Sequence, residues 1–149
     1  MRTYFFIPPL NKITGGLSVI CQLAGILHQA GHTVALVVRE KGLVEKAVDV
    51  PVVDWADVDL KPADIWMIPE GWPNALALGL KAGCRNLVYV QNWAYLLSAM
   101  PESVRWKQLR AEFLSVSSPV AHFVAENLGF GSQILRPGID RNLFKPDKN

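Results

Sequence analysis

The chain has 149 residues, of which 50% are hydrophobic and 19% are charged, so it can bury a core and is not a disordered segment. Its 15 basic and 13 acidic residues give a formal net charge of +2, which is too small to indicate a nucleic-acid partner. Cys21 and Cys84 lie far apart and are expected to be reduced, and no apolar run is long enough to cross a membrane. Because prolines interrupt the apolar start before a signal-peptide core forms, we expect a cytoplasmic protein.

Short, continuous apolar runs predict the main strands, which in chain order are residues 3–8, 33–38, 65–68, 86–90 and 113–117. Strands covered on both faces have this pattern, because a parallel sheet between helices has no side that faces water. The stretch 42–62 is less regular and holds either a short helix and a short strand at VPVV, or mostly loop. A β-like QIL run precedes Arg136.

Helical patterns alternate with these strands. In segment 16–32 the apolar residues recur every three or four positions, and Gly31 is placed to end the helix. In segment 117–130 we expect Ser118 to cap a helix that has Pro119 in its first turn and stops at Gly129. Further helices are expected over roughly 73–82 and 101–111. This alternation predicts the α/β fold class, with a mostly parallel sheet and helices on both faces.

Ligands of such sheets bind beyond the carboxyl ends of the strands, so the loops there are the candidate sites. The first loop, PPLNKITGGLSV, ends the first strand and opens the first helix. Gly15 and Gly16 have no side chains, so a phosphate group can approach the backbone N–H groups and the positive end of the helix dipole. Neither a GxGxxG nor a Walker A motif is present, and a glycine pair that only permits a tight turn is the alternative.

Two later loops combine an acid, two amides and several aromatic residues. EGWPNA follows the strand at 65–68, and QNWAYLL follows the strand at 86–90. Amides and carboxylates bind hydroxyl groups while aromatic rings cover apolar sugar faces, so these loops indicate a polyhydroxylated ligand. The alternative is packing between helices for the tryptophans and loop capping for Asn92.

Other candidates are weaker. The three histidines, His28, His32 and His122, are scattered and predict no metal site. No GxSxG motif surrounds the serines of 115–118, which argues against a hydrolase nucleophile. The segment SVRWKQLR, residues 103–110, gathers basic residues around a tryptophan. It is compatible with a peripheral contact to anionic lipid headgroups, although a solvated helix face is the commoner meaning of such a run.

Three passages together resemble a known family. The Gly-Gly loop, the GHTVALVV that follows the first helix, and FLSVSSPVAHFVAENLGFGSQILRPGIDRNLFKP are similar to the N-terminal half of a retaining glycosyltransferase of family four, group 1. That family has the two-domain GT-B architecture. The resemblance implies a Rossmann-like acceptor-binding domain over residues 1–140 and the start of a linker at 141–149. The donor-binding domain, with its Glu-x7-Glu motif and basic phosphate ligands, is then absent from this chain.

The resemblance also implies roles for single residues. Gly15 and Gly16 match the glycine loop that lies against the donor diphosphate in the family. Where the family often carries a histidine near the reacting sugar, this chain has Gln91 and Asn92, which we take as the candidate catalytic residues. The candidate acceptor-binding residues are Glu70, Trp72, Trp93 and Tyr95. No metal and no other cofactor is implied.

The implied function is transfer of a sugar from a nucleotide-sugar donor, bound mainly by the absent domain, to a glycan or lipid-linked acceptor. Two alternatives stay open: a non-catalytic α/β module that binds a sugar, an anion or a partner protein, and half of a nucleotide-sugar epimerase. A native end at Asn149 would favour the module, and a longer reading frame would favour the transferase. The sequence does not specify the donor sugar, the acceptor or the oligomeric state.

Overall fold

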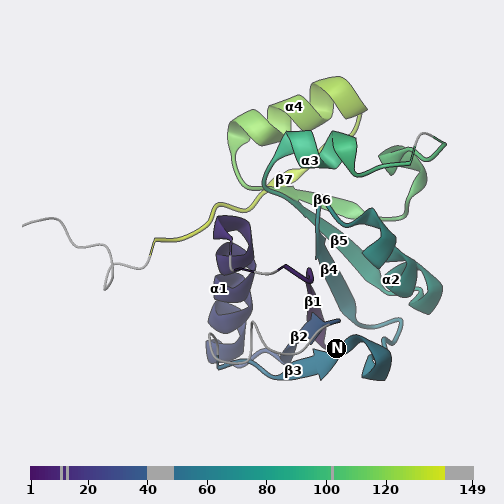
Figure 1. Ribbon diagram of the computed structural model, residues 1–149. Helices are drawn as coiled ribbons and strands as arrows, with labels where there is room; N and C mark the ends of the chain where they lie inside the picture. Colours follow the sequence, from purple (N-terminus) through teal and green to yellow (C-terminus); the bar gives the residue numbers. More distant parts are fainter. Residues whose placement is uncertain (11, 13, 40–48, 102, 140–149) are drawn as a thin grey trace, which may run out of the picture.

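The structure is a computed structural model that describes residues 1–10, 12, 14–39, 49–101 and 103–139. All strands in these ranges join one parallel sheet (Figure 1). Its seven strands have the order β3-β2-β1-β4-β5-β6-β7. The strands are β1 (Thr3–Ile7), β2 (Val34–Val38), β3 (Val52–Asp54), β4 (Ile65–Pro69), β5 (Arg85–Val90), β6 (Glu112–Ser115) and β7 (Gln133–Ile134). The α/β class with a Rossmann-like parallel sheet is therefore confirmed, and β1 lies inside the sheet between β2 and β4.

Helices cover both faces of this sheet (Figure 1). Side chains alternate along each strand, so Phe5 packs in one apolar core and Phe6 packs in another. The first core is completed by α1 (Gly15–Gln29), and the second by α2 (Leu76–Ala82), α3 (Trp93–Ser98) and α4 (Ser118–Leu128). Burial on both faces explains why the strand sequences are continuously apolar. No helix in the described ranges is long and apolar enough to span a membrane.

The prediction of a helix over 101–111 is wrong. In its place Trp106–Gln108 form a single 3-10 turn, and β6 begins at Glu112. Trp106 is buried, donates from its indole Nε1 to the carbonyl oxygen of Leu96 at 2.7 Å, and meets the ring of Phe113 edge-on. Tertiary packing of one large ring thus overrides the local helical pattern. Because this ring faces the core, the SVRWKQLR segment has no aromatic anchor for a lipid surface.

Conversely, α3 forms where the sequence was interpreted as a loop. Asn92 is its N-cap, and the side-chain Oδ1 accepts a hydrogen bond from the N–H of Ala94 at 2.9 Å. An asparagine before an apolar run is a helix-start signal that the sequence offered. The capping alternative for Asn92 is therefore observed.

The remaining boundaries agree closely with expectation. Gly31 and Gly129 follow α1 and α4 with positive φ angles, as helix-ending glycines do. Ser118 is not the cap of α4, because the N-cap is Ser117, and its side chain makes no capping bond. The short strand at VPVV exists as β3. The helix expected in 42–62 falls partly on residues 40–48 and the linker on 140–149, which lie outside the described residues.

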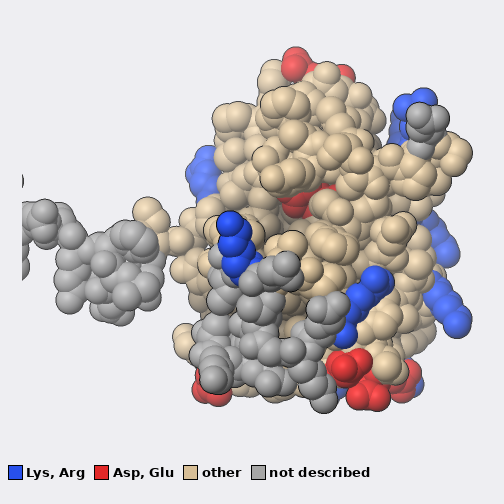
Figure 2. Space-filling model, in the orientation of Figure 1, with Lys and Arg blue, Asp and Glu red and all other residues tan. Residues whose placement is uncertain are grey.

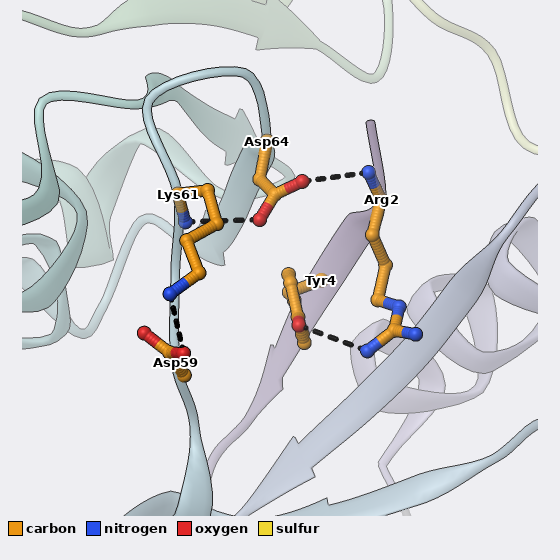
Figure 3. A network of polar contacts seen from close by, with 5 residues as sticks. All are labelled: Arg2, Tyr4, Asp59, Lys61 and Asp64. Atoms are coloured by element: carbon orange, nitrogen blue, oxygen red, sulfur yellow. Dashed lines mark hydrogen bonds and ion pairs between the residues drawn. The ribbon is translucent and has the colours of Figure 1, made fainter.

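The carboxylate of Asp64 links the amino-terminal ends of β1 and β4 by hydrogen bonds (Figure 3). Asp64, which is buried, accepts the N–H of Arg2 on Oδ1 at 2.8 Å and the N–H of Lys61 on Oδ2 at 3.0 Å. The Arg2 guanidinium in turn donates to the hydroxyl of Tyr4 at 3.1 Å. This network holds the start of β1 beside the turn that leads into β4, at the edge opposite the carboxyl ends.

Candidate functional site

A cleft of about 690 Å³ opens beyond the carboxyl ends of the strands, a size that is usual for small-molecule sites. It receives residues that follow β1, β4, β5 and β6, together with the first turn of α1. Since β2 and β4 lie on either side of β1, the strand order reverses here, which is where parallel sheets bind ligands. The predicted site residues that line the cleft are Gly16, Glu70, Trp72, Gln91, Asn92 and Tyr95.

The first turn of α1 borders this cleft. Thr14 is the N-cap, and its Oγ1 accepts the N–H of Leu17 at 3.3 Å. The N–H groups of Gly15 and Gly16 precede the first bonds within the helix, so helix geometry leaves them without an intrahelical acceptor. The first turn carries no acidic residue. It therefore presents a positive dipole end, and a threonine before Gly-Gly-Leu was the sequence signal for that cap.

The two glycines differ in their surroundings. A Cβ atom on Gly15 would meet nothing within 4 Å, and Gly15 lies outside the cleft lining. A Cβ atom on Gly16 would stand 3.2 Å from Nε2 of Gln91. The same amide nitrogen donates to the carbonyl oxygen of Gly16 at 3.2 Å. Gln91 thus connects the end of β5 to the start of α1 across the cleft, and a larger residue at position 16 would require its side chain to shift.

Glu70 brings a carboxylate to the cleft. Its side chain is buried, and Oε1 accepts the N–H of Asn92 at 2.7 Å. Burial raises the pKa of the Glu70 carboxyl, and backbone N–H groups that include those of Asn92 and Gln91 partly oppose this rise. The described residues that line the cleft include no lysine, arginine or histidine. Figure 2 shows acidic atoms recessed near the middle of this face, with separate basic side chains elsewhere on it.

The aromatic residues divide into two groups. Trp72 is half-buried, packs edge-on against Phe6, and lines the cleft. Tyr95 lines it from α3 and is 60% exposed. Trp93 lies outside the cleft lining and stacks on Phe123 of α4, with ring centroids 4.8 Å apart. Packing is therefore observed for both tryptophans, and the difference is that Trp72 and Tyr95 line the cleft whereas Trp93 does not.

No protein-family model matches the chain, and no curated protein matches its sequence. The functional argument therefore depends on the cleft and on the quoted sequence motifs.

Proposed function

We propose that this chain is the acceptor-binding N-terminal domain of a retaining GT-B glycosyltransferase, which moves a sugar from a nucleotide-sugar donor to a glycan or lipid-linked acceptor. The observation that carries the proposal is that one cleft at the strand-order reversal holds a helix N-terminus at Gly16, the carboxylate of Glu70 and the amide of Gln91. The sequence motifs that resemble the family supply the reaction class.

The polar groups of the cleft suit a saccharide. After its bond to Gly16, the Gln91 amide keeps a second N–H and the oxygen Oε1 for ligand hydroxyls. Glu70 has one oxygen bonded to Asn92 and a second with which to accept a hydroxyl. The rings of Trp72 and Tyr95 are suited to cover the apolar face of a sugar.

The donor needs more than this cleft offers. A leaving diphosphate is stabilised by cations and preorganised donors, and the described lining offers uncharged donors such as the first-turn N–H groups of α1 but no cation. In the proposed enzyme the second domain supplies the cations and the nucleotide pocket, and the transition state forms between the two domains, which orient the reactants. We therefore expect the 149-residue chain to bind acceptor saccharides modestly, to bind nucleotide sugars very weakly, and not to transfer sugar by itself.

The test combines binding and product detection on the 149-residue chain. Calorimetry with a panel of nucleotide sugars should show no tight binding, and incubation of each donor with oligosaccharide acceptors should give no product. NMR titration with neutral methyl glycosides should shift the backbone amides of Gly16, Gly71 and Asn92. Tight donor binding, turnover by this chain alone, or cleft amides that no glycoside shifts would each contradict the proposal.

A stand-alone binding module is the second candidate, and one observation favours it. The described cleft lining has no basic side chain, although a diphosphate site usually recruits one. The same titrations separate the two functions, because a module should bind its saccharide tightly without any nucleotide, whereas an acceptor subsite should bind it weakly.

A further inference from the structure

The carboxylate of Glu70 has no counter-ion among the described residues that line its cleft. Glu70 is 3% exposed, and its Oε1 accepts a hydrogen bond from the N–H of Asn92 at 2.7 Å. A buried carboxylate is costly unless it is paired, because it loses its hydration. The acid therefore has a favourable place for a positively charged partner that comes from outside the chain.

Two aromatic side chains line the same cleft. Trp72 enters it from the loop after β4, two residues beyond Glu70, and Tyr95 enters it from α3. The faces of aromatic rings carry negative charge density and attract cations within about 6 Å of the ring centroid. A cleft that contains both a carboxylate and aromatic rings is suited to hold an ammonium group.

The positive end of the α1 dipole would repel a cation in the cleft, so its charge must be compared with that of Glu70. A helix N-terminus is equivalent to roughly half a positive charge, and its influence falls off within the first turn. The carboxylate of Glu70 carries a full negative charge in a buried position where screening is weak. The acid therefore dominates at its own side of the cleft, and the dipole favours electron-rich oxygens at the Gly16 side.

We propose that the acceptor of this cleft is an amino sugar, whose protonated amine pairs with Glu70 beside Trp72 and Tyr95 while its hydroxyl groups bond to Gln91. This inference rests on the proposed function, because it names the chemical class of the acceptor at the same site. The cation supplies a charge partner that the described lining of the cleft does not, and the pairing lowers the pKa of Glu70 that burial has raised.

The test compares methyl glucosaminide, methyl N-acetylglucosaminide and methyl glucoside by NMR titration of the 149-residue chain, at a pH where the free amine is protonated. The glucosaminide should bind about tenfold or more tightly than the two neutral glycosides, as expected for a charge-assisted bond in a buried site. Equal affinity for all three overturns the amino-sugar assignment and leaves the proposed acceptor site intact. Failure of all three to shift the amides of Gly16, Gly71 and Asn92 overturns both.

Substitutions test whether Glu70 is responsible for the preference for the amine. Glu70→Gln keeps an oxygen that can accept the N–H of Asn92, and should abolish the preference for the amine while neutral glycosides still bind. Glu126→Gln makes the same chemical change on the exposed face of α4 and should preserve the preference. If Glu70→Gln does not fold, Tyr95→Ala provides a second measurement, because this exposed ring should contribute a several-fold preference for the amine. A preference for the amine that survives both Glu70→Gln and Tyr95→Ala, or survives whichever of them folds, overturns the inference.

Discussion

The side-chain amide of Gln91 donates from Nε2 to the carbonyl oxygen of Gly16, and the two atoms are 3.2 Å apart. These residues are separated by 75 positions in the sequence. The bond joins the residue after β5 to the first turn of α1. Within the cleft, the side chain of Gln91 therefore packs directly against Gly16. This contact links the loop that contains Gly16 to the loop that contains Gln91.

The first prediction concerns that glycine. In Gly16→Ala the new methyl group would stand 3.2 Å and 3.3 Å from the two terminal atoms of Gln91, which must move aside. Because the displaced group is the end of a flexible side chain, we expect the fold to persist while the side-chain NH₂ resonances of Gln91 shift and glycoside affinity falls several-fold. Gly15→Ala is the matched control, since its methyl group meets nothing within 4 Å. Identical spectra for the two variants would show that the approach of Gln91 to Gly16 is unimportant.

The second prediction concerns Gln91 itself. Gln91→Ala removes one neutral hydrogen bond, which contributes about 0.5–1.5 kcal/mol. If the amide binds the reacting sugar in a complete transferase, the variant should lower kcat more than it raises KM, by a few-fold to about tenfold. Urea unfolding of the variant provides the control. A loss of stability with unchanged kcat and KM would assign Gln91 to loop structure alone.

The third prediction is a pH dependence of stability that originates at Glu70. Its pKa in the folded chain is raised above the ordinary value of 4.5, so above that pH the unfolded chain releases the proton first. The folded state therefore loses stability as pH rises from about the ordinary value to the raised one, and the cost then stays constant. Glu70→Gln does not titrate, so it should match the natural chain near pH 4 and exceed it in stability at pH 8.

Thermal unfolding at several pH values measures this difference. Among the described residues, Tyr89 also senses the Glu70 charge: burial and that charge raise the pKa of Tyr89, so it stays protonated across this range. Glu126→Gln removes only an exposed contact with His122 on α4, which contributes little to stability, so this variant should follow the natural chain closely at every pH. A natural chain that is more stable than Glu70→Gln at pH 8 would contradict the buried-charge interpretation.

The sequence predicts the sheet well, because burial on both faces leaves a signal in each strand separately. The apolar runs at Phe5 and Val37 need no knowledge of partners, and the parallel order follows from the alternation with helices. It predicts the cleft residues to the extent that they follow strands directly, as Glu70 and Gln91 do. Position after a strand is a local property, so a sequence can carry it.

What the sequence misses depends on contacts between distant residues. The burial of Trp106 under Leu96 replaces the expected helix by a turn, and Trp93 stacks on Phe123 outside the lining of the cleft. Neither pairing leaves a trace in the spacing of nearby residues. The approach of Gln91 to Gly16 is likewise visible only after β5 and α1 are placed side by side.

The fourth prediction concerns the opposite edge of the sheet, shown in Figure 3. Asp64→Ala leaves the N–H groups of Arg2 and Lys61 without their carboxylate acceptors. Loss of two such bonds in a partly buried place should cost about 1–3 kcal/mol of unfolding free energy. Asp59→Ala removes only the exposed ion pair with Lys61 and should leave the urea midpoint nearly unchanged. Equal midpoints for the two variants would mean that Asp64 does not hold the strand ends.

The fifth prediction tests the packing of α2 on the sheet. A Cβ atom on Gly79 would lie 1.9 Å from Oδ1 of Asn86 and 2.6 Å from the ring of Trp66, distances that no real structure tolerates. Both neighbours are buried and held by hydrogen bonds, Asn86 to the carbonyl oxygen of Cys84 and Trp66 to that of Ala75, so neither can move aside freely. Gly79→Ala must therefore lift α2 from β4 and β5, and we expect it to lower the unfolding free energy by about 1–3 kcal/mol despite the better helix propensity of alanine.

Gly131→Ala is the control, because a Cβ atom there meets nothing within 4 Å and its φ angle is not positive. Urea unfolding of both variants decides the matter, and a Gly79→Ala variant as stable as the control would show that α2 is not held against the sheet as described.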